Sequence, residues 1–324
     1  MRLPAALLLL AATAATPVHA QSDGLRVVVD VAPVHSLVAR VMGRDPELLI
    51  PATASPHDWA MRPAQAAALE AADLVVLTAP DFAPAAERAV ASLSGATVVA
   101  LAGGGEADGG HGDHDHGDHD HAEDDHAEDD HGHDDHGHGE VGHDDHGHDD
   151  HHDHASAEAH FWLDPREAAE KALAIAEALA EADPDGAATY RANAAALQAD
   201  LAAMEGDLVA RLAPLRGVPL ITAHDAWGLF AERFGLTVAA TVGHSLEGDP
   251  GAARMAELQG IAATAGCAVA EPQESPRLLM TAIDGAGLPV VEVDPLGAAL
   301  TPGADLYAAL MDDVADALLG CVDG

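Results

Sequence analysis

The chain has 324 residues, which is enough for two domains of ordinary size. Its formal net charge is −41, and residues 103–159 contribute 21 acidic residues with no Lys or Arg, which leaves −20 for the rest of the chain. Because the remainder is still acidic, the composition argues against a nucleic-acid-binding protein and favours cationic ligands or partners.

The first twenty residues predict a cleaved secretory signal. Met1 and Arg2 give a short positive start, the following apolar run is too short to span a bilayer, and the small residues that end at Ala20 form a cleavage site. No cysteine lies in or just after this segment, so a lipid anchor is not expected. We therefore expect residues 1–20 to be removed and the mature protein to be exported, soluble and periplasmic.

The next part of the chain alternates short apolar runs with Ala-rich segments, as in βα units around a parallel sheet. The predicted strands are 25–34, 47–51, 72–79 and 96–102, and helices are predicted at 62–72 and 84–93. Residues 21–183 are thus predicted to form an N-terminal α/β lobe.

A histidine-rich loop over residues 103–159 interrupts this lobe. It has no apolar anchors and is predicted to be disordered without metal, because it cannot bury enough surface to offset the entropy of ordering. Imidazoles flanked by carboxylates suit zinc, copper or nickel, so many weak accessory sites are expected, and the alternative is a solvated acidic linker. The sixteen accessory histidines are His111, His114, His116, His119, His121, His126, His131, His133, His136, His138, His143, His146, His148, His151, His152 and His154.

Residues 184–214 read as one long connecting helix. Apolar residues from Tyr190 to Leu212 recur at three- and four-residue spacing, and prolines bound the segment at both ends. The alternative is two shorter helices joined near Gly206. A single helix would act as a stiff strut between two lobes.

Residues 215–324 repeat the βα pattern and predict a C-terminal α/β lobe. The predicted strands are 217–224, 236–243, 267–273 and 289–295, and the predicted helices are 225–234, 250–265, 276–285 and 304–319. The two cysteines of the chain, Cys267 and Cys321, lie in this part, and an exported protein is found where disulfides persist. We predict that they pair, and two buried free thiols are the alternative.

Three histidines lie near the ends of predicted strands, where α/β sheets place their binding sites. They are His57, His160 and His224, and each is followed within three residues by a tryptophan that could help to desolvate a site: Trp59, Trp162 and Trp227. A metal site in a cleft between the lobes explains all three. His35 is expected to pack or cap, His19 to leave with the signal, His244 to lie in a loop near the cleft, Glu271 to support the site, and Asp225 to orient His224.

The segments SPHDWAMRP, HFWLDP, HDAWGLFAERFGL, AEPQ and DPLG, together with the two cysteines and the histidine-rich insertion, resemble the ZnuA-like zinc-binding solute-binding proteins of bacterial ABC importers. The resemblance covers essentially the whole mature chain. It implies two (βα)4-type lobes with parallel sheets, joined by a rigid helix, with the metal site in the interlobe cleft.

The resemblance also implies the metal ligands. It identifies His57, His160 and His224 as ligands, and Asp294 matches an aspartate ligand of manganese-binding relatives, so Asp294, a water or a loop residue is expected at the fourth position. Three imidazoles with one oxygen suit Zn²⁺, whereas manganese prefers shells richer in carboxylates.

By the same resemblance, the expected function is capture of Zn²⁺ and its delivery to an ABC permease with its ATPase, by a monomer that catalyses no reaction. The alternatives are a binding protein for manganese or another divalent metal, a periplasmic zinc buffer, and a zinc hydrolase. The sequence has neither an HExxH helix nor a G-x-S-x-G elbow, which disfavours the hydrolase.

Overall fold

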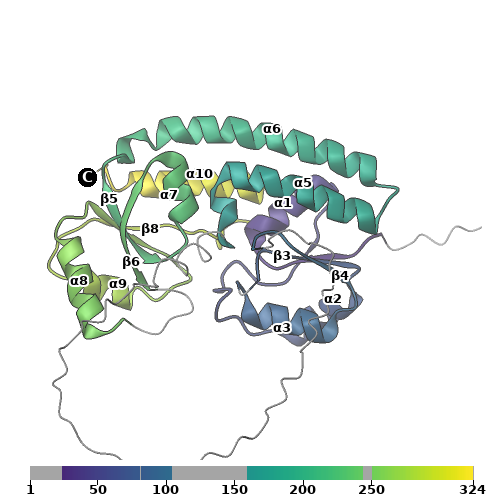
Figure 1. Cartoon of the computed structure of the whole chain (residues 1–324), viewed down its shortest axis with the longest axis horizontal. Coiled ribbons are helices and arrows are strands. Elements are labelled where there is room, and N and C mark those ends of the chain that lie inside the picture. The colour runs from purple at the N-terminus through teal and green to yellow at the C-terminus, as the bar shows by residue number, and fades with distance from the viewer. Residues whose placement is uncertain (1–23, 81, 104–158, 244–249, 324) are drawn as a thin grey trace, which may run out of the picture.

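The computed structural model describes residues 24–80, 82–103, 159–243 and 250–323. These residues form two lobes, each built on a parallel sheet of four strands (Figure 1). The first sheet has the order β2-β1-β3-β4 and consists of β1 (Val27–Val29), β2 (Glu47–Leu48), β3 (Leu74–Leu77) and β4 (Thr97–Ala100). The second has the order β6-β5-β7-β8 and consists of β5 (Pro219–His224), β6 (Thr237–Gly243), β7 (Cys267–Ala270) and β8 (Val290–Glu292). The predicted α/β class with two four-stranded lobes is confirmed.

Helices cover the sheets and join the lobes. In chain order they are α1 (Ala32–Met42), α2 (Pro63–Ala71), α3 (Pro84–Leu93), α5 (Pro165–Ala182), α6 (Ala187–Arg211), α7 (Gly228–Phe234), α8 (Ala252–Ala262), α9 (Arg277–Ala282) and α10 (Leu306–Leu319). No helix among the described residues combines the length and the apolar content needed to cross a membrane.

The first strand is shorter than predicted. The sequence predicts a strand over 25–34, but β1 ends at Val29 and α1 begins at Ala32. Pro33 lies in the first turn of α1, where a proline needs no amide hydrogen and its fixed φ suits a helix. The prediction of a strand was therefore wrong from Asp30 onward.

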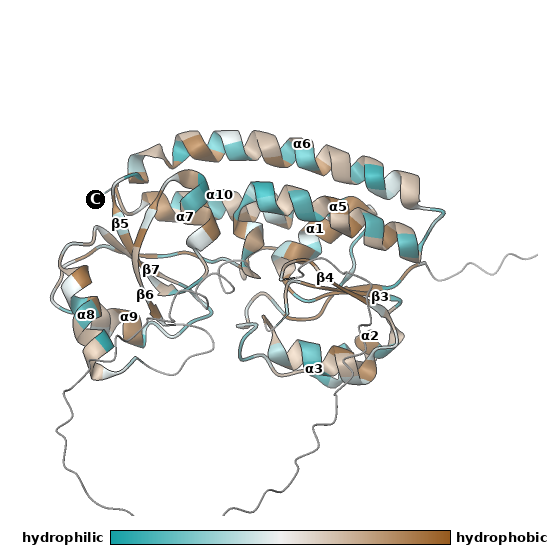
Figure 2. Cartoon of the chain, in the orientation of Figure 1, coloured by the Kyte–Doolittle hydropathy of each residue, from teal (hydrophilic) through white to brown (hydrophobic). Residues whose placement is uncertain are grey.

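The central strands are buried on both faces, as parallel sheets require when helices cover them. Every residue of β1, β3 and β7 is buried, and brown, hydrophobic colour covers much of the labelled strand β3 in Figure 2. Pairing is parallel throughout, with Val28 opposite Val75 in the first sheet and Ile221 opposite Ala268 in the second. The carboxyl ends of the strands within each sheet therefore lie along one edge, where the loops that carry functional side chains begin.

A single helix, α6, joins the lobes. It spans 25 residues and runs along one side of both lobes, with α5 and α1 packed against it (Figure 1). Tyr190, Ala194, Leu197, Leu201 and Leu208 form its buried face. The helix continues without a break through Gly206, where nothing lies within 4 Å of the position a Cβ would take. The prediction of one continuous helix is therefore confirmed.

The C-terminal segment provides a second link between the lobes. The Trp162 indole donates to the carbonyl of Pro295 at 2.9 Å, and the Tyr307 hydroxyl donates to the carbonyl of Trp162 at 2.6 Å. The amide of Tyr307 also donates to Ser36 Oγ on α1 at 3.0 Å. These contacts fasten the chain that leaves the second sheet to the first lobe.

The predicted disulfide between Cys267 and Cys321 is confirmed, with the Cα atoms 5.6 Å apart. It joins the buried strand β7 to the turn that follows α10. The bond therefore anchors the end of the described chain to the core of the second lobe.

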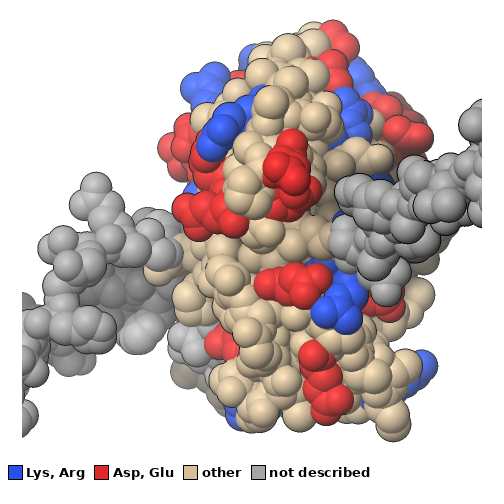
Figure 3. Space-filling model, turned by 90° about the vertical axis from the view of Figure 1, so that its right-hand side faces the viewer, with Lys and Arg blue, Asp and Glu red and all other residues tan. Residues whose placement is uncertain are grey.

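Ion pairs on the surface are mostly exposed. Arg26 pairs with Asp73 and Arg191 with Glu177, and more than two-fifths of each of these side chains is accessible to solvent. Such exposed pairs contribute little to stability, because water screens them. Seen from the end of the first lobe, acidic and basic side chains are interspersed rather than gathered into a basic surface (Figure 3).

Candidate metal centre

Three histidines from separate segments meet between the lobes. His57 lies in the loop after β2, His160 directly precedes the short 3-10 helix η1 (Phe161–Leu163), and His224 is the last residue of β5. The first two belong to the N-terminal lobe and the third to the C-terminal lobe. His224 thus lies at the carboxyl end of a parallel strand, where sheets of this kind bind ligands.

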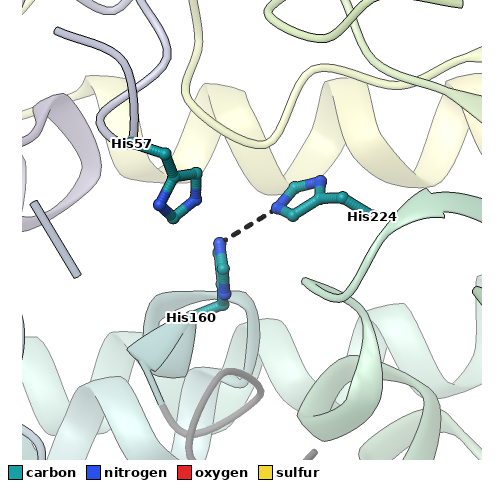
Figure 4. Close-up of side chains that lie close together, drawn as sticks. All are labelled: His57, His160 and His224. Atoms are coloured by element: carbon teal, nitrogen blue, oxygen red, sulfur yellow. Dashed lines mark hydrogen bonds between the residues drawn. The ribbon is translucent and has the colours of Figure 1, made fainter. Parts of the chain in front are cut away.

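The three side chains converge closely enough to share one metal ion. A ring nitrogen of each histidine lies within 4.8 Å of one from each of the others, and the rings face a common point (Figure 4). The Nε2 atoms of His160 and His224 are 3.3 Å apart. Two nitrogens that bind one zinc tetrahedrally at about 2.0–2.1 Å lie about 3.3 Å from each other, so this separation matches zinc. Within the described segments, no other group of three His, Cys, Asp or Glu side chains is arranged in this way.

Aromatic rings form one wall of the site. The ring of Phe82 lies 5.2 Å from that of His57 and 5.3 Å from that of His160, and the ring of Trp162 lies 5.2 Å from His160 and 5.6 Å from Phe82. Burial, followed by the charge of a protonated His224, lowers the pKa of His57 to about 4. Because a metal binds the neutral imidazole, His57 is ready to bind at neutral pH without releasing a proton.

Glu271 orients His224. Its Oε2 lies 2.8 Å from His224 Nδ1, and its Oε1 accepts a hydrogen bond from the Trp227 indole at 2.9 Å. Burial alone would lower the pKa of His224, but the charge of Glu271 and its hydrogen bond raise that pKa above the usual value. The carboxylate holds the proton on Nδ1 and turns Nε2 toward the other two histidines, an arrangement common among histidines that bind metals.

An ion-pair network joins the loops that carry His160 and His224. Asp164 caps α5 through the amide of Arg166 and accepts hydrogen bonds from Arg233 Nε at 2.8 and 2.9 Å. Arg233 lies in the last turn of α7, which begins four residues after His224. Glu205 of α6 accepts a hydrogen bond from Arg166 at 2.8 Å and lies 3.9 Å from Arg233. The connecting helix and both lobes therefore meet in one charged cluster.

Asp294 does not lie with the three histidines. Its Oδ1 accepts hydrogen bonds from Gln273 Nε2 and from the amides of Leu296 and Gly297 at 2.7–2.9 Å, and its Oδ2 accepts one from the amide of Ala298 at 2.5 Å. Asp294 is absent from the side chains that line the pocket around the histidines. Its carboxylate organises the loop that follows β8.

The remaining predicted residues divide into two groups. His35 is buried, and its Nε2 lies 2.9 Å from the carbonyl oxygen of Pro46, which fits the predicted packing role. Trp59 is buried in the core but does not line the pocket, and Phe82 provides the aromatic contact to His57 instead. The signal segment with His19, the histidine-rich loop and His244 lie outside the described residues.

Sequence reasoning did not single out Phe82, Ser55 or Glu274, although all three line the pocket. Ser55 opens the SPHDWAMRP segment, but Phe82 and Glu274 lie outside the segments that carry the resemblance. Glu271, which was expected to support the site, contacts His224 Nδ1 although it lies 47 positions after His224 in the sequence. Only the pairing of β5 with β7 brings these two residues together.

Two parallel α/β lobes joined by one helix, with a small site of three histidines between them, define a two-lobed metal-binding protein of the solute-binding class. The family model described as "Zinc-uptake complex component A periplasmic" matches residues 27–321. The chain belongs to this ZnuA family.

Relatives support this assignment over almost the full length. The chain is 39% identical over 325 residues to the high-affinity zinc uptake system protein ZnuA of Paracoccus denitrificans, with 98% of each chain covered. It is 36% identical to the protein of the same name from Brucella abortus, with 91% of each covered. A crystal structure of a ZnuA superposes with a TM-score of 0.65 at 22% identity, covering 91% of this chain and 99% of the other, which supports the fold.

Proposed function

We propose that the protein captures Zn²⁺ in the periplasm and delivers it to the permease of an ABC importer, and that His57, His160 and His224 bind the ion. The observation that carries this proposal is the convergence of three imidazole nitrogens from both lobes within 4.8 Å of one another. The relatives in Paracoccus denitrificans and Brucella abortus, both named as zinc uptake proteins, support zinc as the cargo.

The donor set favours zinc over manganese. Three imidazoles and one oxygen make a common tetrahedral zinc shell, whereas manganese prefers more carboxylate and water oxygens. The separation of 3.3 Å between the Nε2 atoms of His160 and His224 also fits the short bonds and tetrahedral angles of zinc. Zinc should therefore displace manganese from this site at equal concentrations.

The protein acts in transport and catalyses no reaction. The pocket between the lobes offers room for about one water-sized sphere beside the histidines, which suits a bare ion better than an organic substrate. A bound ion would contact side chains of both lobes and would be released when the permease draws them apart. The histidine-rich loop would raise the local supply of zinc, a proposal supported by its sixteen histidines.

A competitive zinc titration against a strong chelator tests this function. The mature protein lacking residues 103–155 should retain one tight site, and His224→Ala in that background should abolish it or weaken it by orders of magnitude. Asp294→Asn is a matched control at the position to which the resemblance assigns the fourth ligand, and it should leave the affinity within a few fold. If the shortened protein binds no zinc tightly, the three-histidine site is not the cargo site.

A further inference from the structure

The pocket between the lobes contains two carboxylates besides the three histidines: Glu271 and Glu274. Zinc bound by three imidazoles completes its tetrahedron with a fourth ligand, which in proteins is often an oxygen. Both oxygens of Glu271 already have partners, because one accepts from Trp227 and the other lies 2.8 Å from His224 Nδ1. Asp294 is similarly occupied with Gln273 and backbone amides. Glu274 is the remaining carboxylate of the pocket, and because it lies outside the group of ligand atoms within 4.8 Å of one another, it would have to move toward the ion to bind it.

Glu274 is held in place from the opposite lobe. It lies in the turn after β7 in the C-terminal lobe, where its amide donates to the carbonyl of Glu271 at 3.2 Å. The Ser55 hydroxyl donates to Glu274 Oε1 at 3.1 Å, and Ser55 lies in the N-terminal lobe two residues before His57. Glu274 Oε2 takes part in none of the hydrogen bonds found among the described residues.

We propose that Glu274 Oε2 is the fourth, oxygen ligand of the zinc site and that Ser55 aims this carboxylate across the interlobe gap. This inference rests on the proposed function, because it assumes that the three histidines bind the cargo ion. His57 and His160 would then come from one lobe, and His224 and Glu274 from the other. The ion would be bound by two ligands from each lobe.

The electrostatics of the pocket agree with this arrangement. Burial raises the pKa of Glu274 above its usual value, although the charge of a protonated His224 and the hydrogen bond from Ser55 oppose this rise. Bound Zn²⁺ would add positive charge and favour the ionised form. The neighbouring Gln273 donates to the carbonyl of Ala52 in the other lobe at 3.0 Å, so the turn that carries Glu274 is fixed on both sides.

The test compares Glu274→Gln with Glu292→Gln in the full mature chain, by competitive zinc titration and by thermal unfolding without metal. Glutamine keeps the shape of the side chain but removes the charged oxygen, and Glu292 is an exposed glutamate on β8 that does not line the pocket. Removing groups that only support a ligand lowers metal affinity by about 10–100-fold, so loss of a ligand should cost at least about tenfold. Glu292→Gln should bind zinc like the wild type.

The outcomes separate this inference from the proposed function. If His224→Ala destroys the tight site while Glu274→Gln binds like the wild type, Glu274 is not a ligand and the three-histidine site stands. If His224→Ala has no effect, the proposed function fails as well. A crystal structure of the zinc-loaded wild type gives the answer even if Glu274→Gln does not fold: Oε2 within about 2.2 Å of zinc supports the proposal, and a water in that position overturns it.

Discussion

The ion pair between Arg233 and Asp164 should be the most stabilising charge interaction that joins the two lobes. The Asp164 side chain is 3% exposed and that of Arg233 is 21% exposed, so water screens the pair poorly. Arg233→Met keeps most of the side-chain volume but leaves the Asp164 carboxylate buried without its partner. Breaking a buried pair in this way lowers the free energy of unfolding by about 3–5 kcal/mol. Because Arg233 is partly exposed, we expect a loss of about 3 kcal/mol. For a protein of this size, that loss lowers Tm by about 6–12 °C.

Urea unfolding of the metal-free protein, followed by circular dichroism, measures this loss, and two further variants test its cause. Arg191→Met removes a pair of similar geometry on the exposed surface and should leave stability unchanged. Adding Asp164→Asn to Arg233→Met should recover part of the stability, because asparagine still caps α5 but strands no charge. The reasoning is refuted if Arg233→Met and Arg191→Met unfold alike, or if the double variant is less stable than Arg233→Met.

Three other predictions concern the disulfide, a buried acid and the histidine-rich loop. Replacing both Cys267 and Cys321 with Ala should lower the free energy of unfolding by about 4 kcal/mol, measured in urea, because the bond closes a long loop. Burial raises the pKa of Asp30 to about 6 in the folded chain. Its contribution to stability is therefore fully present below its unfolded pKa of about 4 and is lost as pH rises through 6. Asp30→Asn should remove this loss of stability with rising pH, as measured by unfolding at a series of pH values. Deleting residues 103–155 should reduce the number of zinc ions bound at equilibrium dialysis while one tight site remains.

Helices that are marked by nearby residues, such as a proline at their start or a regular apolar spacing, could be predicted from the sequence. Pro84 marks the start of α3, whose bounds match the prediction, and the apolar spacing along α6 predicted a helix that extends three residues beyond the observed one at each end. α5 was not predicted, although Asp164 followed by Pro165 is a strong helix start. The predicted strand at 25–34 was too long because Pro33 lies in the first turn of a helix instead of continuing the strand.

The site was predictable only in part, because its histidines can be recognised in the sequence and its acidic residues cannot all be told from the many others in the chain. His57, His160 and His224 stand out, since histidine is rare outside the loop and each occurs beside a tryptophan. Glu271 could be expected to support the site, because it lies at the end of a predicted strand in the same lobe as His224. Glu274 is an ordinary acidic residue in a very acidic chain, and its role depends on which atoms it faces. Those contacts require the pairing of β5 with β7 and the packing of one lobe on the other, which no local pattern encodes.

The links between the lobes bear on how zinc would be captured. α6 crosses once, the segment from Pro295 to Tyr307 crosses back and is fastened to Trp162, and the Arg233–Asp164 pair joins the lobes beside the histidines. His160 lies four residues before Asp164 and His224 nine residues before Arg233, so the pair helps to hold their Nε2 atoms 3.3 Å apart. We therefore expect zinc to bind with small shifts of the loops that carry His57 and Glu274, rather than with a wide closure of the lobes.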